Sequence, residues 1–368
     1  MAVLVKEFRQ VRRDRLTFGM MVAVPILQLI LFGYAINGDP RNLPLAVVDA
    51  DQSVFSRSFI AGLENSRYFR VVARPDSEAA ADRLLDIGTV QFSLVIPAGF
   101  ATRLARREQP ALLFTADATD PSATGNALGA LNQIAEHAMG RELTGPLAGL
   151  RAGAAPWDIR VQRRYNPEGL TRDNVVPGLI GVIQTMTMVM LTALAIVREK
   201  ERGTMENLLA TPARPVEVML GKIVPYILVG YLQAGITLVA ARLLFGVPLV
   251  GSLTLLAGAL GLFMAANLAV GFTFSTIAHN QLQAMQLTFF FFLPSMLLTG
   301  FMFPFRGMPE WAQAVGEALP LTHFLRVVRG ILLKGNGWHE IAPELWPIAA
   351  FMVAAGVVAL LRYRQTLD

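Results

Sequence analysis

The sequence predicts a polytopic α-helical membrane protein with six transmembrane helices and an extracytoplasmic α/β domain inserted between spans one and two. Three observations support this prediction. The 368-residue chain is 54% hydrophobic and only 16% charged, with a mean hydropathy of +0.47, which is far more apolar than a soluble domain needs. Its apolar residues are gathered into uncharged runs long enough to cross a bilayer. One long segment between the first two runs has the composition of a soluble domain.

Six segments are apolar enough to be transmembrane helices. A helix needs about 20 predominantly apolar residues to cross a hydrocarbon core of roughly 30 Å. The fourth apolar run is too long for one span, and the turn sequence FGVPLVGS near its start indicates that the span begins after it. The predicted spans are residues 16–38, 175–197, 223–241, 251–276, 281–305 and the shorter 345–361.

Residues 1–38 are predicted to hold an interfacial helix and the first span. The apolar run at 16–38 is longer than the roughly 7 to 15 residues of a signal-peptide core and has no small-x-small cleavage site, so we interpret it as a retained anchor. Before it, apolar residues recur at helical spacing with basic residues between them, which is typical of a helix lying in the membrane interface. The apolar residues are Leu4, Phe8 and Val11, and the basic residues are Lys6, Arg9, Arg12 and Arg13.

Lysine and arginine predict the side of the membrane that each segment faces. Basic residues are dense before the first span, in the stretch 198–222 and after the last span, and they are sparse in the short loops on the other side. Because cytoplasmic loops carry the excess of Lys and Arg, both termini and the stretch 198–222 are predicted to be cytoplasmic. The long insert between spans one and two then lies outside.

The insert at 39–173 is predicted to be a small α/β domain. Short β-branched or aromatic runs predict strands, and they alternate with segments of helical pattern. Asp120 followed by Pro121 is typical of a helix start and opens the longest of these helices. The predicted strands lie in LPLAVVD, RYFRVVAR, VQFSLVIP, ALLFTAD and WDIRVQRRYNP, and the other helices at 53–65, 76–86 and 97–107.

The sequence gives little support to a catalytic, metal or nucleic-acid site. The chain has no cysteine, which excludes disulfides and thiolate nucleophiles. His137 has no second ligand at metal-binding spacing, and Asp49 with Asp51 fits a strand-to-helix turn and cap better than a carboxylate pair. The basic residues lie beside apolar spans rather than on a soluble basic face, which argues against nucleic-acid binding. The functional interpretations left open for the insert are docking of a partner and capture of a substrate.

The centres of the predicted spans carry no acidic residue. A charge at the bilayer centre costs about 2.5 to 3.5 kcal/mol on insertion scales, and ion-coupled carriers usually accept that cost to build a relay. Polar amides within the spans are predicted to bond between helices or to line a route; they are Gln28, Gln184, Gln233, Asn267 and Gln286. Small residues on one face of span four predict close helix packing, with a pathway lining as the alternative; they are Ala257, Gly261, Ala265 and Ala269.

Residues 304–340 are too long and too patterned for a simple turn. Pro309 can open a short helix, and a second helix with one apolar face is predicted to stop near Gly335. We therefore predict short helices at the outer membrane surface. The apolar face of the second helix carries Phe324, Val327, Val328 and Ile331.

The stretch VREKERGTMENLLATPARPVEVMLGKI joins spans two and three and is rich in charge. Three interpretations of this stretch are considered: a solvated loop, a nucleotide site, or a surface through which another protein acts. A nucleotide site is excluded because Lys222 is followed by no Ser or Thr and preceded by no Gly-rich loop. Thr204 can cap a short helix with Glu206 in its first turn, and Pro212 and Pro215 interrupt and restart it. The residues alone leave the other two interpretations open.

Eight motifs follow one another along nearly the whole chain. They are KEFRQVRRDR, YNP at 165–167, VPGLIG at 176–181, LTALAIVREKERGTMENLLATP, LGKIVPY at 220–226, FGVPLVGS, LTGFMFPF and RGILLKG. In this order and spacing they resemble the permease subunit of ABC-2 type (type V) ABC exporters, specifically the bacterial drug-efflux-like group with a large periplasmic insert after span one. One departure is Arg164, where an aromatic residue is expected before YNP.

The resemblance implies a multi-pass permease subunit of the bacterial inner membrane. It implies a second permease chain, identical or related, a cytoplasmic ATP-binding subunit and often a periplasmic adaptor protein, with membrane lipid around the spans. ATP and Mg²⁺ would bind the ATPase subunit, so this chain is expected to be no enzyme and to hold no catalytic residue, cofactor or metal of its own. The implied cargo is hydrophobic or amphiphilic, drug-like or lipid-like, and moves outward.

The resemblance also implies three groups of functional residues. ATPase-coupling residues map to Arg198, Glu199, Arg202, Gly203, Thr204, Glu206 and Pro212 in the stretch 198–222. Residues of the interfacial helix that contact the ATPase map to Lys6, Phe8, Arg12 and Arg13, and outer-gate residues map to Pro304, Pro309, Phe324 and Arg329. Spans two to six occupy the remaining segment, 174–368.

Two other classes of function are compatible with the composition. An ion-coupled carrier is one, and it is opposed by the uncharged centres of the spans. A non-transporting membrane scaffold or sensor is the other; it would bind a partner through the outer α/β domain and would need no ATPase.

Overall fold

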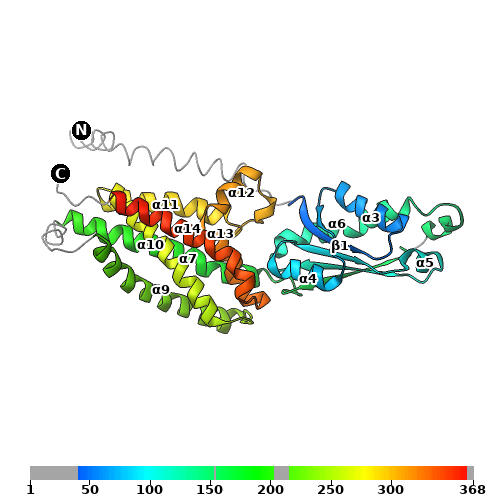
Figure 1. The fold of residues 1–368 in the computed structure, drawn as a ribbon, viewed down its shortest axis with the longest axis horizontal. Helices are drawn as coiled ribbons and strands as arrows, with labels where there is room; N and C mark the ends of the chain where they lie inside the picture. The colour runs from blue at the N-terminus through cyan, green and yellow to red at the C-terminus, as the bar shows by residue number, and fades with distance from the viewer. Residues whose placement is uncertain (1–39, 153–154, 203–214, 363–368) are drawn as a thin grey trace, which may run out of the picture. The chain divides into compact units, whose positions relative to one another are not determined.

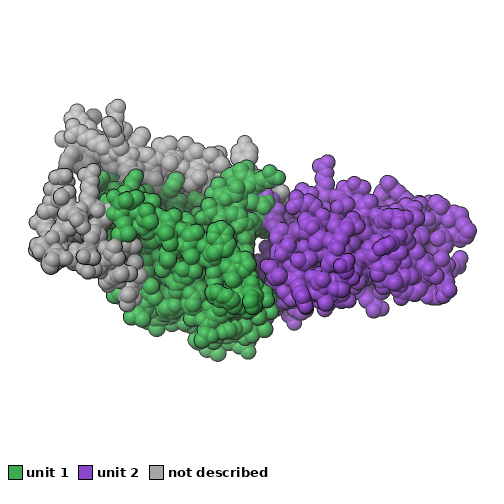
Figure 2. Space-filling model, in the orientation of Figure 1, with its two compact units in different colours: residues 1–36, 175–305, 309–368 green, residues 37–174, 306–308 purple. Residues whose placement is uncertain are grey.

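The computed structural model describes residues 40–152, 155–202 and 215–362. The chain divides into two compact units, coloured differently in Figure 2. The α/β unit comprises residues 37–174 with 306–308, and the membrane unit comprises residues 1–36, 175–305 and 309–368. The two units have separate hydrophobic cores and are described one at a time.

A five-stranded sheet lies at the centre of the α/β unit, in the order β2-β1-β3-β4-β5. β1 pairs in parallel with β2 and β3, β3 pairs antiparallel with β4, and β4 pairs in parallel with β5. All five strands lie within the runs that the sequence predicts. They are β1 (Leu43–Asp49), β2 (Phe69–Ala73), β3 (Phe92–Ile96), β4 (Ala111–Asp117) and β5 (Asp158–Arg164).

The helices of the α/β unit begin and end at residues with recognisable capping chemistry. The hydroxyl of Ser53 accepts from the N–H of Ser56 at 3.2 Å, and α4 stops at Gly88, whose φ of +83° is left-handed. The predicted helices are thus confirmed with small changes at their ends. They are α3 (Val54–Asn65), α4 (Glu78–Ile87), α5 (Phe100–Ala105) and α6 (Pro121–Gly140), followed by the 3₁₀ segment η2 (Gly145–Ala152).

Helices cover both faces of this sheet (Figure 1). Alternate residues of β1 point to opposite faces, as a strand requires. Leu43, Leu45 and Val47 are buried in the core shared with α3, α5 and α6, whereas Ala46 and Val48 are buried in the core shared with α4. The result is a three-layer α/β arrangement in which β1 and β3 are buried on both sides, whereas most of the edge strand β5 is exposed.

Asp49 and Asp51 serve as caps, as the sequence predicts. One oxygen of Asp49 accepts from the N–H of Gln52 at 2.9 Å, and the other accepts from the hydroxyl of Ser56 at 2.8 Å. The carboxylate of Asp51 accepts from the N–H of Ala101 in the first turn of α5, at 3.3 Å. Both side chains therefore satisfy backbone or side-chain donors around a strand-to-helix turn.

Five helices of the membrane unit are long and apolar enough to cross a membrane (Figure 1). The first predicted span, 16–38, lies outside the described residues, so the count of six stays a prediction. The described helices are α7 (Thr171–Glu201), α9 (Pro215–Phe245), α10 (Leu253–Ile277), α11 (Gln281–Leu298) and α14 (Trp338–Arg362).

Two of these helices have ends that differ from the sequence prediction. α11 ends at Leu298 rather than near residue 305, because the chain turns at Gly300, whose φ is +80°. α14 begins at Trp338, well before residue 345. The charged Glu344 does not mark the start of this helix, because it lies inside it and is paired with basic side chains of another helix.

Two short helices lie between α11 and α14, as the sequence predicts. They are α12 (Glu310–Glu317), capped by Pro309, and α13 (Pro320–Arg329). α13 continues into a π-helical turn, η4 (Gly330–Lys334), which the sequence does not predict. The turn ends at Gly335 with a φ of +74°, at the predicted stop, and the N–H of Val250 donates to the carbonyl of Leu332 at 3.1 Å.

Small residues on α10 let its neighbours approach closely. The hydroxyl of Tyr231 on α9 lies over Gly261 and donates to the carbonyl of Ala257 at 2.8 Å, so these two members of the predicted small-residue face are packing positions. On α10 a Cβ at Gly271 would lie 2.6 Å from the carbonyl oxygen of Val189 on α7. Glycine is therefore required where α7 and α10 touch.

Gly271→Ala is expected to lower the stability of the membrane unit by about 1–3 kcal/mol, because the added methyl group meets a backbone carbonyl that cannot rotate away. Gly258→Ala on the same helix is the control, since nothing lies within 4 Å of a Cβ built there. The apparent melting temperature of each purified variant in detergent checks this. Equal melting temperatures for the two variants would contradict the packing described.

Candidate functional site

The predicted ATPase-coupling residues fall only partly within the described chain. Arg198 and Glu199 occupy the last turn of α7, and Arg202 follows it; both arginines are exposed. The remaining coupling residues and the residues of the interfacial helix lie outside the described residues. They are Gly203, Thr204, Glu206, Pro212, Lys6, Phe8, Arg12 and Arg13. Their assignment to the ATPase contact therefore stays a prediction.

The four predicted outer-gate residues lie in the segment of α12 and α13 or just before it. Pro304 is buried, and Pro309 caps α12. Phe324 is buried on α13 and stacks on Phe263 of α10, with ring centroids 4.2 Å apart and an interplanar angle of 8°. Arg329, at the end of α13, donates to the carbonyl of Gly300 at 3.1 Å.

Two glycines of the VPGLIG motif bring α13 close to α7. A Cβ at Gly181 would lie 2.7 Å from Leu321 and 2.9 Å from Phe324. A Cβ at Gly178 would lie 2.8 Å from the ring of Phe301 and 3.3 Å from Leu325. These glycines lie one turn apart, so one face of α7 forms a shallow surface on which α13 packs.

A cluster of four charged or titratable side chains joins α12, α13 and α14. We call Glu317, His323, Arg326 and Glu344 the polar cluster. The guanidinium of Arg326 bonds to both oxygens of Glu317, in one case at 3.1 Å, and lies 3.3 Å from an oxygen of Glu344. His323 Nδ1 lies 2.5 Å from the same Glu344 oxygen. Two acids face two bases, so the cluster is close to neutral when His323 is protonated.

The surroundings of His323 favour its doubly protonated form. Nδ1 faces the carboxylate of Glu344, and Nε2 lies 2.9 Å from the backbone carbonyl oxygen of Glu317. Both partners accept hydrogen bonds, so both ring nitrogens are satisfied only when both carry a proton. Burial alone lowers the pKa of His323, but the hydrogen bonds to Glu344 and to the Glu317 carbonyl, with the negative charge of Glu344, raise it above its ordinary value.

Sequence reasoning did not find the polar cluster. Arg326 lies in the segment 304–340 that is predicted to hold short outer helices, and Glu344 lies directly before the predicted last span, 345–361. An arginine on the side poor in basic residues, with an acid early in the next apolar run, was the available signal. In the part of the chain that the structure describes, no three His, Cys, Asp or Glu side chains are placed to hold a metal ion.

A protein-family model described as an ABC-2 family transporter protein matches residues 15–361. The chain belongs to this family. It is 28% identical over its full length, and over 97% of the relative, to the probable multidrug ABC transporter permease YbhS of Escherichia coli (strain K12). It is also 28% identical to the inner membrane transport permease YhhJ of the same organism, covering 99% of this chain and 96% of YhhJ.

A third Escherichia coli (strain K12) relative, the probable multidrug ABC transporter permease YbhR, is 26% identical and covers 98% of this chain and 96% of YbhR. No solved structure matches the chain. Membership of the ABC-2 family makes the chain the permease subunit of an ABC exporter. The family implies a partner ATP-binding subunit, a dimeric arrangement and a multi-pass location in the inner membrane.

Amide side chains join α7 to α9 inside this ABC-2 permease, as the sequence predicts. Gln184 on α7 donates to the carbonyl of Gly230 on α9 at 2.7 Å, and Gln233 on α9 donates to the hydroxyl of Thr187 at 3.2 Å. Asn267 instead donates to the carbonyl of Phe263 within its own helix. The buried oxygens of these three amides have no hydrogen-bond partner among the described residues, so they are available acceptors within the bundle.

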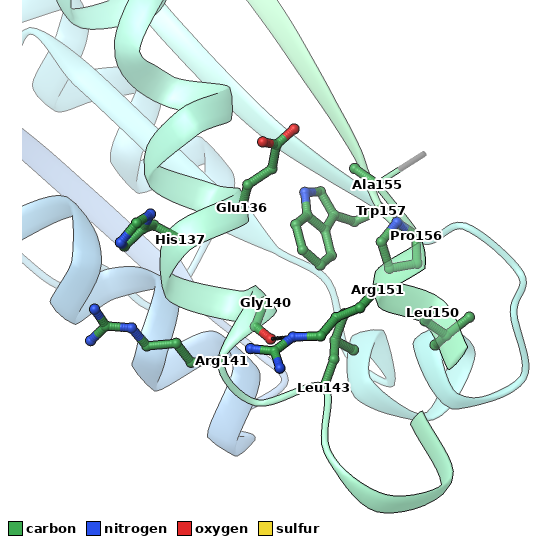
Figure 3. Close-up of a pocket in the computed structure, with 10 residues that line it drawn as sticks. All are labelled: Glu136, His137, Gly140, Arg141, Leu143, Leu150, Arg151, Ala155, Pro156 and Trp157. Carbon is green, nitrogen blue, oxygen red and sulfur yellow. Dashed lines mark hydrogen bonds between the residues drawn. The ribbon is translucent and has the colours of Figure 1, made fainter. Parts of the chain in front are cut away.

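The α/β unit of the ABC-2 permease holds a pocket of about 430 Å³ beside the end of α6 (Figure 3). Buried Trp157 forms one wall, and Leu143 and Leu150 add apolar surface. Arg151 reaches across and donates from Nε to the carbonyl of Gly140 at 2.8 Å. The rest of the lining includes the polar or charged side chains of Glu136, His137 and Arg141.

His323→Gln is expected to remove a pH dependence of stability. The pKa of His323 is raised in the folded protein, so its contribution is fully present below the unfolded pKa of about 6.5 and is lost as pH rises through the folded pKa. The wild-type melting temperature should therefore fall as the pH is raised from about 6 to 9. The variant should show a flatter profile, and His339→Gln, which changes an exposed histidine, should follow the wild type. Parallel profiles for all three proteins would refute this assignment.

Proposed function

We propose that this ABC-2 permease moves hydrophobic or amphiphilic molecules out of the cytoplasm or the inner leaflet. Two permease chains, identical or related, form the pathway, and a separate cytoplasmic subunit binds ATP with Mg²⁺ and hydrolyses it. The single observation that carries this proposal is the family match over residues 15–361, which includes all five described membrane helices. The printed names of YbhS and YbhR, both probable multidrug permeases, support a drug-like or lipid-like cargo.

In this proposal both termini and the stretch 198–222 are cytoplasmic, and residues 39–173 form a periplasmic domain. The distribution of Lys and Arg supports this orientation. Five basic residues of the predicted outer segments oppose the trend; they are Arg242, Arg306, Arg326, Arg329 and Lys334. Arg326 is paired with carboxylates, and Arg329 donates to a backbone carbonyl, so neither weakens the orientation as much as an unbound cation would.

Each region then has a distinct role. The stretch 198–222 and the interfacial helix receive the motion of the ATPase, and α12, α13 and η4 act as the outer gate. The polar cluster holds α12 and α13 of this gate in register with α14, and the stacked pair Phe263 and Phe324 closes the apolar side of the gate. The pocket beside Trp157 receives an amphiphilic molecule or a short segment of a periplasmic adaptor.

An ion-coupled carrier is not favoured. α10 and α11 contain no charged residue, and the acids of α14 lie near its start, where Glu344 is paired with Arg326 and His323. No acid is placed at mid-membrane in the described spans to carry a proton or sodium ion. ATP supplied from another subunit explains the transport step without such a relay.

The purified permease is expected to bind its cognate ATPase subunit and to stimulate ATP hydrolysis and cargo export in liposomes. Arg202→Ala and Glu206→Ala should each reduce the stimulation by about fivefold or more, because both remove charged contacts of the coupling stretch. Glu64→Gln, which changes an exposed carboxylate of the α/β unit, is the control. If no ATPase subunit co-purifies, or if both coupling variants transport like the wild type, this mechanism is wrong.

Cysteine labelling tests the orientation, because the natural chain has no cysteine. Gly125→Cys places a thiol on the exposed side of α6, where nothing lies within 4 Å. It should react with a membrane-impermeant maleimide in intact cells, whereas Arg202→Cys should react only after the inner membrane is permeabilised. The reverse pattern would overturn the proposed topology.

A further inference from the structure

α7 ends in two residues of opposite charge that reach the turn between α10 and α11. The ammonium of Lys200 donates to the carbonyl oxygen of Ser275 in the last turn of α10. The carboxylate of Glu201 accepts from the backbone N–H of Gln281, at 2.9 Å, and from the side-chain amide of the same residue. Consecutive residues of one helix therefore hold both sides of a turn that two other helices form. We call these contacts the α7 clamp.

The two charges match the helix ends that they contact. The last carbonyls of a helix carry partial negative charge and the first N–H groups carry partial positive charge. The carbonyl of Ser275 would receive the N–H of His279 if α10 continued, but that N–H donates to the side chain of Gln283 at 2.8 Å. Gln281 is the first residue of α11, so its N–H has no partner in its own helix. The α7 clamp satisfies both of these open backbone groups.

The turn between α10 and α11 is fixed by its own hydrogen bonds. Only residues 278–280 separate the two helices. The side chain of Asn280 accepts from the N–H of Gln283 at 2.8 Å, while the side chain of Gln283 accepts from the N–H of His279. This reciprocal cap leaves the turn little conformational freedom. A force applied to the turn therefore moves the adjoining ends of α10 and α11 together.

Apolar packing beneath the clamp joins the same elements. Ala193 and Val197 of α7 are buried against Ala278, Ala284 and Leu287 of the turn and α11. This cluster is separate from the main core of the membrane unit. The end of α7 and the α10–α11 turn therefore form a small packed body of their own.

α11 connects this body to the short helices at its far end. A Cβ at Gly316 on α12 would lie 2.4 Å from the carbonyl oxygen of Leu298, so α12 rests directly on the last residue of α11. Arg329 of α13 donates to the carbonyl of Gly300, two residues beyond α11. One helix thus has the α7 clamp at its first residue and α12 and α13 at its last.

We propose that Lys200 and Glu201 are positioning residues that lock the end of α7 to the α10–α11 turn. A displacement applied to the stretch 198–222 then reaches α12 and α13 through α11, as well as through α7 and α9 directly. The proposal rests on the proposed function for the source of that displacement. Neither residue is required to touch ATP or cargo. Their substitution should therefore lower transport while ATP hydrolysis continues.

The test measures how much of a fluorescent amphiphilic dye, rhodamine 6G, the full permease–ATPase complex exports in liposomes for each ATP hydrolysed. Glu201→Ala and the exchange of the two charges, Lys200→Glu with Glu201→Lys, should keep ATPase binding and basal hydrolysis but lower this ratio by about fivefold or more. The charge exchange keeps the amino-acid composition, but it places a negative side chain at the carbonyl end of α10 and a positive side chain at the N–H end of α11. Arg362→Gln, which changes an exposed basic residue at the end of α14, should match the wild type.

A cross-link separates a positioning role from loss of folding. Glu201→Cys with Gln281→Cys removes the carboxylate contact, and a short bifunctional methanethiosulfonate reagent can restore the connection covalently, because the chain has no other cysteine. The reduced pair should be uncoupled and the cross-linked pair should recover wild-type export per ATP. Cross-linking should proceed at the same rate with and without ATP, since the two sites move together.

Four results decide between the clamp proposal and the proposed function. If the charge variants keep full export per ATP, or if the cross-linked complex binds ATPase but does not export, the clamp proposal is wrong while the proposed function stands. If cross-linking slows markedly with ATP, the two sites move apart and the proposal is also wrong. If the wild-type complex itself shows no ATP-driven export, the proposed function fails first.

Discussion

A helix leaves its first N–H groups and its last carbonyl groups without partners in its own ladder, so each place where a helix stops needs partners from elsewhere. The membrane unit is organised around this constraint. Lys200 and Glu201 complete the α10–α11 turn, and Arg329 binds the carbonyl of Gly300, where the chain leaves α11. Val250 donates to the carbonyl of Leu332 in the π turn. Each of these bonds comes from a different helix or loop, so satisfying the ends also ties the helices together.

The middle of the bundle is held differently. There α7 meets α10 and α13 through glycines, and the stacked rings of Phe263 and Phe324 provide apolar contact. Such contacts have shape but little direction, whereas the hydrogen bonds at the ends fix both distance and angle. Where only these packed surfaces meet, α7 can adjust against α10 and α13 by small shifts, whereas hydrogen bonds from Gln184 and Gln233 hold α7 to α9. That division suits a protein in which force enters at one end and acts at the other.

The elements that the sequence predicts correctly are those with local signals. Ser53, Gly88 and Gly335 mark helix ends by their own chemistry, and the apolar runs mark the spans by length alone. Phe324 lies on the short helix that the sequence predicts, because the apolar periodicity of α13 is a local pattern, whereas the outer-gate role of Phe324 and Arg329 stays a prediction.

The polar cluster and the α7 clamp were not predicted, because each depends on residues that only the fold brings together. Glu344 follows His323 by 21 residues, and Glu201 precedes Gln281 by 80. The predicted start of the last span was wrong because of Glu344. A charged residue at that point indicates a solvent-exposed position unless its partners are known. Patterns in a single sequence report the periodicity and the secondary-structure propensity within one helix or strand. They give no information about which residue of another element a side chain will contact.

The polar cluster fixes the relative positions of α12, α13 and α14 more than it adds to the stability of the fold. The side chains of Arg326 and Glu317 are 37% and 43% exposed, and exposed ion pairs add little net free energy because water screens their attraction. The hydrogen bonds of the cluster are nevertheless directional, and Arg326 reaches Glu317 and Glu344 at once only when α12, α13 and α14 lie in one arrangement. A sliding shift of α13 by one turn would leave two carboxylates without a partner. The cluster therefore favours discrete positions of α12 and α13, and α11, packed against α12 and followed by Gly300 whose carbonyl accepts from Arg329 of α13, is placed to act on the gate that we propose.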